Sequence, residues 1–346
     1  MRVVQVCRTA PPRVGGLESV VGGLSRALVE RGHDVRLVTL GDPGHDDLDG
    51  VEVVRLRRLG SERWPTARGL ARACRGADLV HVHGIDGLLD TLLLRGLHPL
   101  GVSTHGGYFH TPRQAWLKEL WLRTGTRVAL HAADAVWYTS EADRRRLAAA
   151  HAPGTVEPDG VDLAPFLGLP RRPQPGRWLV LGRIARHKGL VELLDTLALL
   201  RDRRWTLELV GPEDEAGEVA RVLARARMLG LGERVAWRGA LRGPDLLDAV
   251  SCAELGLLPS RYEGFGLAAV ELMAARVPVV LSEIEAFRQH AAVAPLAPFD
   301  RPERAAALVV DTLDRPEVEA AARHASTFAW PARAASFEAR YRELIQ

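Results

Sequence analysis

The chain has 346 residues, of which 47% are hydrophobic, and its 46 basic residues nearly balance its 43 acidic ones. This length and composition predict about two packed domains and exclude intrinsic disorder, while the small net charge argues against a dedicated nucleic-acid-binding protein. The three cysteines are too far apart for a disulfide framework or a zinc site. We expect a cytoplasmic protein, because the sequence shows neither a signal peptide nor a run of about 18 apolar residues.

The first half alternates short apolar runs with amphipathic patterns. The apolar runs predict strands over residues 2–7, 35–40, 51–56, 78–83, 101–104 and 135–138. An amphipathic pattern predicts a helix over residues 17–31, ended by Gly32. Strands that alternate with helices indicate parallel βαβ units with right-handed crossovers.

A proline-rich stretch, LPRRPQPG at residues 169–176, predicts a linker, and the alternation restarts after it. The second half has predicted strands over residues 178–181, 206–210, 234–237, 254–258 and 277–281, and predicted helices over 190–200, 215–229 and 267–275. We predict an α/β protein with two doubly wound, Rossmann-like domains, residues 1–168 and 177–328. Ligands of such sheets bind at the carboxyl ends of the strands, so we expect the site in a cleft between the halves.

The strongest chemical signal is the sequence SRYEGFGLAAVELMAAR, which follows a predicted strand. Gly264, Phe265 and Gly266 lead into a helix, and glycines there let backbone amides approach a ligand near a helix end that favours negative charge. We expect a phosphate or an oxyanion at this turn. Glu271 is the only charged residue inside the apolar helix; a ribose diol would satisfy its carboxylate, and a structural ion pair with Arg276 is the alternative.

Two cations flank a loop after another predicted strand, in the sequence LVLGRIARHKGLVELL. Arg183 follows Gly182, and Lys188 is one of only two lysines in the chain. A guanidinium can grip two oxygens and an ammonium acts as a point charge, so the pair suits a pyrophosphate. The alternative is that both side chains are merely solvated. The loop lacks the GK[ST] sequence of a P-loop.

In the first half, the sequence VSTHGGYFHT places His105 at the end of a predicted strand. A histidine at this end faces the expected cleft and can bind a sugar hydroxyl through its side chain or backbone. The first βα loop brings the pair Gly15 and Gly16 to the same edge. A strand-end histidine by itself is more often structural, so this signal gains weight only together with the others.

Taken together, these segments resemble the retaining glycosyltransferases of the GT-B fold, family four. The resemblance covers nearly the whole chain and includes the glycine pair after the first strand, the HG turn, the PDGVD segment at residues 158–162, the GR…K pair, and the E-x7-E element formed by Glu263 and Glu271. It also implies that the helix over residues 330–345 returns to the first domain, so that residues 329–346 belong with residues 1–168.

The resemblance implies a role for each candidate residue. Arg183 and Lys188 would hold the diphosphate, Glu271 would bind the ribose, and Glu263 would meet the sugar and the distal phosphate. His105 would contact the donor sugar. The full set implied for donor binding is Gly16, Arg183, Lys188, Leu241, Gly264, Phe265, Gly266, Leu267 and Glu271, and the set implied for catalysis is His105 and Glu263.

The reaction implied is transfer of a hexose, with GDP-mannose and UDP-hexoses as the leading donors, to a hydroxyl of a glycan, a lipid-linked sugar or a natural product. The second domain would hold the donor and the first the acceptor. No cofactor and no metal are predicted, because the two cations can neutralise the leaving group. A metal-dependent alternative would use Asp47 and Asp49 in the sequence HDDLDG, which we interpret as a solvated loop.

Other function classes remain as alternatives. A sugar-nucleotide epimerase could share the fold and the diphosphate site, and a silent nucleotide-sugar-binding protein could share both without turnover. A dinucleotide dehydrogenase is disfavoured, because neither half carries GxGxxG after its first strand.

Residues 113–127, RQAWLKELWLRTGTR, predict a helix with tryptophans beside basic residues. Such a surface suits peripheral association with an anionic membrane; packing of Trp116 and Trp121 into the core is the alternative. Each of the arginine clusters over residues 55–75 and 144–146 has two interpretations, a solvated face or a lipid-docking surface.

Overall fold

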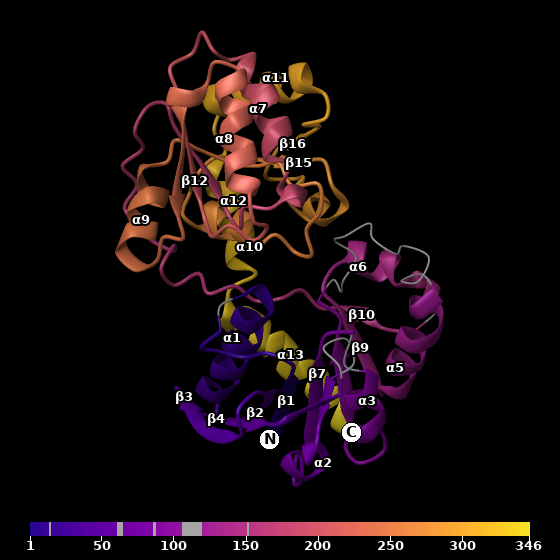
Figure 1. Ribbon diagram of the computed structural model, residues 1–346. Helices are drawn as coiled ribbons and strands as arrows, with labels where there is room; N and C mark the ends of the chain where they lie inside the picture. Colours follow the sequence, from indigo (N-terminus) through magenta and orange to yellow (C-terminus); the bar gives the residue numbers. More distant parts are fainter. Residues whose placement is uncertain (14, 61–64, 86–87, 106–119, 151) are drawn as a thin grey trace. The chain divides into compact units, whose positions relative to one another are not determined.

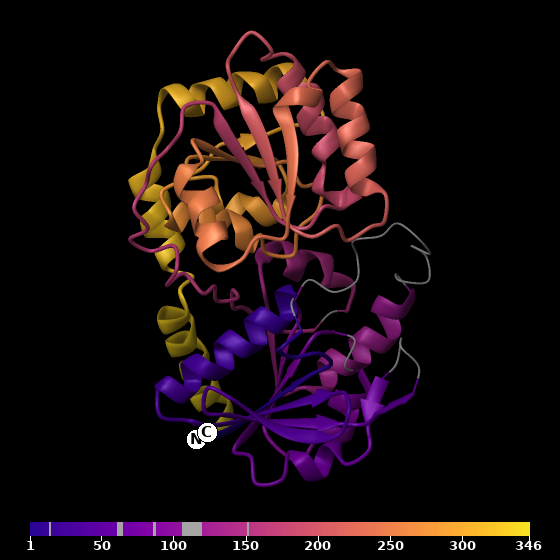
Figure 2. The same ribbon diagram turned by 60° about the vertical axis from the view of Figure 1, so that its left-hand side comes forward.

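The computed structural model of the chain describes residues 1–13, 15–60, 65–85, 88–105, 120–150 and 152–346. Packing divides the chain into two units, each with its own sheet (Figures 1 and 2). The first unit comprises Met1–Asp162 and Phe328–Gln346, and the second comprises Leu163–Thr327.

The first unit is built on a twisted, mostly parallel sheet. Its strands are β1 (Arg2–Cys7), β2 (Asp34–Leu40), β3 (Gly44–Leu48), β4 (Val51–Leu56), β7 (Leu79–His83), β8 (Leu100–Ser103), β9 (Ala135–Tyr138) and β10 (Thr155–Val156). They lie in the order β10-β9-β8-β7-β1-β2-β4-β3. A separate hairpin joins β5 (Arg58–Gly60) to β6 (Pro65–Ala67). The strands predicted from the apolar runs are therefore confirmed.

Helices cover both faces of this sheet. They are α1 (Gly16–Glu30), α2 (Leu70–Ala73), α3 (Leu88–Leu94), α5 (Arg127–Ala132), α6 (Glu141–Arg146) and α13 (Trp330–Ile345), with a π-helical turn at Leu122–Thr126 and a 3-10 turn at Ala148–Ala150. α1 and α13 bury their apolar residues in one core, on one face of the sheet. α2 and α5 contribute to a second core on the other face. Each parallel strand is thus shielded from water on both faces, as its apolar sequence requires.

The segment HDDLDG is not the loop that we expected. It forms the exposed edge strand β3, which pairs antiparallel with β4 through a tight turn at Asp49 and Gly50. Asp47 accepts a hydrogen bond from the Gly50 amide at 3.2 Å, and Asp49 lies 3.5 Å from the guanidinium of Arg26. Charged side chains on an edge strand protect it from pairing with other chains, which accounts for the acidic sequence without a metal.

The second unit has an entirely parallel sheet. Its strands are β11 (Arg177–Leu181), β12 (Thr206–Val210), β13 (Val235–Gly239), β14 (Leu255–Leu258), β15 (Val279–Ser282) and β16 (Leu296–Ala297). They lie in the order β13-β12-β11-β14-β15-β16. Both units therefore have Rossmann-like parallel sheets, and the predicted fold class is confirmed.

Helices also cover both faces of the second sheet (Figure 2). They are α7 (Leu190–Ala198), α8 (Glu218–Met228), α9 (Gly243–Cys252), α10 (Leu267–Ala274), α11 (Pro302–Asp314) and α12 (Val318–Ser326), with 3-10 turns at Arg186–Lys188, Gly232–Arg234 and Glu285–His290. α7, α8 and α11 share one core with the strands, and α10 packs against α12.

The predicted linker, residues 169–176, is hydrogen-bonded to the second unit. The Arg171 guanidinium donates to the carbonyls of Val250, Ser251 and Ala253 at the end of α9, at 2.6–3.0 Å. The amide of Arg172 donates to the Ser251 carbonyl at 3.0 Å. An arginine that caps the last carbonyls of a helix satisfies acceptors the helix leaves unpaired. The prolines therefore mark an extended segment fastened to the second unit.

The C-terminal helix α13 packs on α1 in the first unit. Its first residue, Trp330, lies against Gly23 and Gly160, where a Cβ atom would overlap the indole ring. Farther along, Tyr341 is fully buried, and Glu338 pairs with Arg31, the residue after α1. The glycine in the sequence PDGVD is thus needed for close packing of α13.

Candidate functional site

Each sheet has one point where the chain order reverses. In the second unit the chain runs outward from β11 through β12 to β13, then returns to the other side of β11 with β14. Loops after the two neighbouring strands diverge there, which leaves a crevice at their carboxyl ends. The predicted diphosphate residues follow β11 and the EGFG turn follows β14. Both signals therefore lie at the point where the topology favours a ligand.

The turn after β11 brings backbone close to backbone. Gly182 has φ +142° and Gly211, after the neighbouring strand β12, has φ +148°. A side chain at Gly211 would overlap the Gly182 carbonyl, so only glycine fits. The chain then enters the 3-10 turn Arg186–Lys188 and the helix α7 through Gly189.

Lys188 and Glu263 meet across the two strand-end loops. The Lys188 Nζ lies 2.6 Å from Glu263 Oε1, and the Ser260 hydroxyl donates to the same oxygen at 2.7 Å. The side chains of Lys188 and Glu263 are 17% and 13% exposed, so the pair is largely shielded from water yet reachable. An ammonium has three donors, so Lys188 can hold this carboxylate and still donate to a phosphate oxygen.

Backbone contacts fix the two loops to each other. The Arg261 amide donates to the His187 carbonyl at 2.7 Å. Gly189, with φ +65°, lies so close to the Pro259 carbonyl that a Cβ atom would overlap it. The Lys188–Glu263 pair is therefore held by a rigid frame.

The EGFG turn leads into α10 as predicted. Gly266, with φ +89°, is the N-terminal boundary of the helix, and Phe265 is 5% exposed. The N-cap residue Gly266 has no side chain to cap the helix, and the first amides of a helix, here beginning with Leu267, are the ones that favour an anion. Gly264 is half-buried in the turn before it.

Glu271 lies one turn into α10 and is half-buried, while the rest of the helix is largely buried. The Arg276 guanidinium, the partner named in the alternative ion pair, donates to Glu319 at 2.8 Å. Ribose binding by Glu271 stays a prediction.

Two further candidate donor-binding residues, Arg183 and Leu241, follow strands of the same sheet. The Arg183 guanidinium is 57% exposed and bonds Asp214 at 2.8 Å. Leu241 is half-buried in the loop after β13, whose last residue, Gly239, accepts a hydrogen bond from the Gly211 amide at 2.8 Å.

In the first unit, the corresponding reversal lies between β1 and β7. Gly16 is the first residue of α1, which follows β1. The carboxylate of Glu18, in the first helical turn, lies over Gly15. The first turn of α1 thus already carries an anionic side chain beside its amides.

His105 follows β8 and adopts a left-handed backbone, with φ +47°, that residues other than glycine rarely take. Its Nδ1 lies 3.1 Å from a carboxylate oxygen of Asp159, and its amide donates to the Thr139 hydroxyl at 3.0 Å. Burial by itself lowers the pKa of His105, but the carboxylates of Asp159 and Asp143 outweigh it and raise the pKa above the ordinary value. The geometry and the charges both favour an imidazolium.

The side chains behind His105 were not predicted from the sequence. Its Nε2 lies 2.8 Å from His83 Nδ1. The His83 ring also bonds Gln5, which donates to the Tyr341 hydroxyl at 3.3 Å. His81 and His83, two residues apart in HVH, share one face of β7, and that spacing was the signal that could have revealed them.

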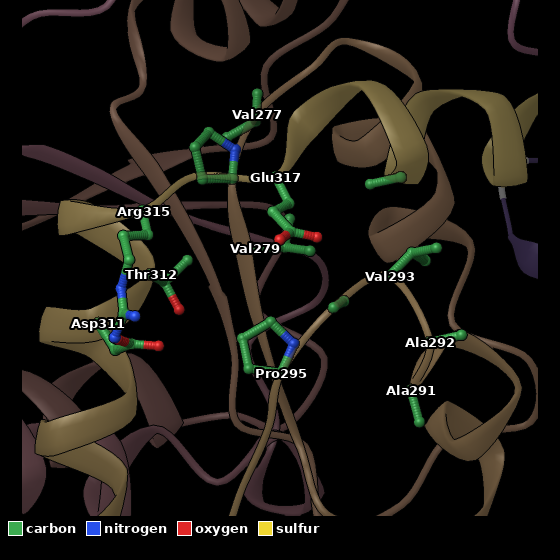
Figure 3. A pocket seen from close by; sticks show the side chains of 13 residues that line it. Val277, Val279, Ala291, Ala292, Val293, Pro295, Asp311, Thr312, Arg315 and Glu317 are labelled. Carbon is green, nitrogen blue, oxygen red and sulfur yellow. The ribbon is translucent and has the colours of Figure 1, made fainter.

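A hollow of about 280 Å³ in the second unit lies elsewhere (Figure 3). It is lined by Val279 at the start of β15, by Val277 and Pro295 before β15 and β16, and by Asp311 of α11 and Arg315 just after that helix. This is the amino end of the sheet, opposite the carboxyl ends where Lys188 and Glu263 lie. We do not assign the donor to this hollow.

Some predicted features lie outside the described residues, namely Trp116, Lys118 and the glycines after His105. Within the described part of the predicted helix, Trp121 packs against Gly125, and Arg123 and Arg127 are exposed. No helix in the described residues is both long and apolar enough to cross a membrane. Among the same residues, no group of three or more His, Cys, Asp or Glu side chains is arranged to hold a metal ion.

Comparison with known proteins identifies the family. Residues 14–165 match the family model Glycosyltransferase Family 4, and residues 175–315 match glycosyl transferases group 1. A GDP-mannose:cellobiosyl-diphosphopolyprenol alpha-mannosyltransferase of Xanthomonas campestris is 38% identical over 305 residues, which cover 83% of this chain and 80% of that protein. The chain belongs to glycosyltransferase family 4. The predicted resemblance is confirmed, and the glycosyltransferase uses a nucleotide sugar as its donor.

Other relatives agree with this assignment. A protein of the same name from Komagataeibacter xylinus is 35% identical over 303 residues, covering 83% of the glycosyltransferase and 77% of the relative. Sucrose-phosphate synthase from Thermosynechococcus elongatus has a TM-score of 0.82 at 22% identity, covering 99% of both chains. Anabaena HepE in complex with UDP and glucose has a TM-score of 0.78 at 17% identity, covering 99% of this chain and all of that one. At these identities the two structures support the fold.

Proposed function

We propose that this glycosyltransferase transfers mannose from GDP-mannose to a sugar hydroxyl of an acceptor carried on a polyprenyl diphosphate, with retention of the anomeric configuration. The observation that carries the proposal is the 38% and 35% identity, over 83% of the chain, to two proteins named for that donor and that class of acceptor. The Lys188–Glu263 pair at the sheet reversal supplies the matching chemistry.

In the proposed reaction, the bond between the mannose C1 and the β-phosphate oxygen breaks, and a bond from the acceptor oxygen to C1 forms. The acceptor proton passes to the departing diphosphate. Lys188, Arg183 and the amides at the start of α10 stabilise the charge that develops on the diphosphate. Glu271 binds the ribose, Leu241 lies near the base, and Gly16 approaches the phosphate from the first unit. His105 and Glu263 position the sugar.

The direct test incubates the purified protein with GDP-mannose and a polyprenyl-diphosphate-linked disaccharide, and measures both GDP release and mannosylated acceptor. We expect both products in equal amounts, and little turnover with UDP-glucose, UDP-galactose or ADP-glucose. A changed nucleotide sugar without acceptor product would identify an epimerase instead. Tight GDP-mannose binding with no turnover would identify a binding protein.

The same assay tests independence from metal. Because cations and helix amides stabilise the diphosphate, EDTA should leave the transfer rate within about two-fold of the untreated enzyme. Loss of activity in EDTA that Mg²⁺ or Mn²⁺ restores would contradict the metal-free mechanism.

Peripheral binding to an anionic membrane is part of the proposal, because an acceptor on a polyprenyl chain is presented at a membrane. The exposed arginines of α6, Arg144 and Arg145, with Arg123 and Arg127, provide cationic charge in the first unit. We expect the enzyme to sediment with phosphatidylglycerol vesicles at low salt and to be released at high salt. Absence of sedimentation at low salt would point to an acceptor taken from solution.

A further inference from the structure

A chain of buried polar side chains runs behind His105 through the first unit. The side chains of Gln5, His83 and Tyr341 are at most 2% exposed. They come from β1, β7 and α13, so three elements far apart in sequence contribute to one network. Buried polar groups of this kind need complete hydrogen bonding, and such a network is rigid when every member is satisfied.

The hydrogen bonds determine where the protons lie. Gln5 Nε2 donates to the Tyr341 hydroxyl, which leaves Gln5 Oε1 to face His83 Nε2. An amide oxygen only accepts, so His83 must carry its proton on Nε2 and present a bare Nδ1 to His105. The neutral form of His83 is also the stable one, because burial and the neighbouring His81 and His105 lower its pKa well below the ordinary value.

His105 must then donate from both ring nitrogens. Its Nε2 faces the bare Nδ1 of His83 at 2.8 Å, and its Nδ1 faces the Asp159 carboxylate at 3.1 Å. A histidine that donates from both nitrogens is an imidazolium. Among the described residues, the titratable groups that act on it are the carboxylate of Asp159, the more distant carboxylate of Asp143, and the neutral rings of His83 and His81.

The C-terminal helix supports both ends of this arrangement. Tyr341 anchors Gln5 and also lies 2.7 Å from His81 Nδ1. On the other side, Arg333 pairs with Glu157 and donates to the Pro158 carbonyl at 3.1 Å, next to Asp159. The helix therefore holds the two partners of His105 in place.

We propose that His83, Gln5 and Tyr341 are positioning residues that hold His105 as an imidazolium with a fixed ring orientation during glycosyl transfer. The inference rests on the proposed function in one respect, namely that His105 lies at the transferred sugar. With both nitrogens engaged, His105 offers the donor its backbone carbonyl and a fixed positive charge, which stabilises the negative charge that leaves with the diphosphate.

The decisive measurement is the pH titration of the His105 ring, monitored by NMR of protein labelled with ¹⁵N in its histidine rings. The His105→Ala variant assigns the His105 signals. We expect both ring nitrogens of His105 to be protonated at pH 7. Removing the acceptor in His83→Phe, or freeing the His83 tautomer in Gln5→Met, should lower the pKa of His105. If the Gln5 amide were reversed, His83 would donate to a neutral His105, and the same variants would raise that pKa. A rise, or no change, overturns the proposal.

Kinetics provide a second test with a mild variant. Tyr341→Phe removes the hydroxyl that bonds Gln5 and His81. It should lower kcat by about two- to twelve-fold, the factor that the hydrogen bond to Gln5 is worth. The KM for GDP-mannose should stay near wild type, because the second unit holds the diphosphate. The matched control is Tyr138→Phe, which removes a hydroxyl that donates to the Ala152 carbonyl at 2.9 Å in the same unit; it should leave kcat and the His105 titration unchanged.

The possible failures are distinguishable. If Tyr341→Phe lowers the melting temperature but changes neither kcat nor the titration of His105, the network is only structural and the proposal is wrong. If the wild-type enzyme does not use GDP-mannose, the proposed donor is wrong, while the NMR titration still decides the state of His105.

Discussion

The two units place candidate site residues at the same edge of similar parallel sheets, but they hold them differently. In the second unit, tight glycine turns at Gly182 and Gly266 bring backbone to the sheet edge, and the charged pair Lys188–Glu263 lies across them. In the first unit, His105 depends on buried side chains from three separate elements. Turns that bring backbone amides to the sheet edge are suited to binding a diphosphate, because this group needs only amides and cations as partners. A histidine that needs one charge and one orientation requires a side-chain network.

The largest effect should come from the residues closest to the transferred sugar in each unit. His105→Ala and Glu263→Gln should each reduce the transfer rate by about 10²–10³-fold, the range found when one group that stabilises developing charge is removed. Affinity for GDP, measured by calorimetry, should stay near wild type. His98→Ala, before the other end of β8, is the control for the first variant. A wild-type transfer rate in either variant would refute the role assigned to that residue.

Binding of the nucleotide should depend mainly on the second unit. Lys188→Ala should weaken GDP binding by about 10- to 100-fold, because a charge-assisted hydrogen bond is lost. Glu271→Ala should weaken it similarly through the ribose. Arg186→Ala, in the same 3-10 turn but 74% exposed and paired with Glu215, should leave GDP affinity unchanged. Equal affinities in all three variants would show that the diphosphate binds elsewhere.

The glycine turns of the second unit can be tested by a matched pair of substitutions. Gly266 and Gly217 have φ values of +89° and +84°, so alanine strains the backbone at both. At Gly266 the new Cβ would overlap the Phe287 ring, whereas at Gly217 it meets open space. Gly266→Ala should therefore lower the free energy of unfolding by about 1–3 kcal/mol more than Gly217→Ala, measured by urea denaturation. Equal losses would mean that the Phe287 ring moves aside freely.

The buried histidines of the first unit should make its stability depend on pH, and this effect should be smaller than those above. The pKa values of His81 and His83 are lowered by burial, so the unfolded chain binds more protons than the folded one once the pH falls below about 6.5. Stability should decrease on acidification through that value. His105, with its raised pKa, acts in the opposite direction and loses its contribution as the pH rises. The protection factors of the β7 amides, which are exchange rates corrected for the intrinsic rate at each pH, should be smaller at pH 5.5 than at pH 7.5. Larger protection factors at pH 5.5 would contradict the burial of neutral rings.

Short-range patterns in the sequence were sufficient for the fold and for most of the second unit's site. Apolar runs of four to six residues predicted the strands, and glycines at strand ends predicted the turns at Gly182 and Gly266. Lys188, Glu263 and Glu271 followed from the same segments and from the family resemblance. The error at Asp47 has a local cause: a charged edge strand has no apolar run, so it was mistaken for a loop.

What only the tertiary structure decided is which side chains meet. Gln5 and Tyr341 are 336 residues apart in sequence, and their hydrogen bond exists because α13 returns to the first sheet. The pairing of Lys188 with Glu263 depends likewise on two strands becoming neighbours through a reversal of chain order. Patterns of hydrophobicity and glycine act over about ten residues and specify local structure. Proton positions and ion pairs depend on distances of about 3 Å, which are set only when separate elements pack together.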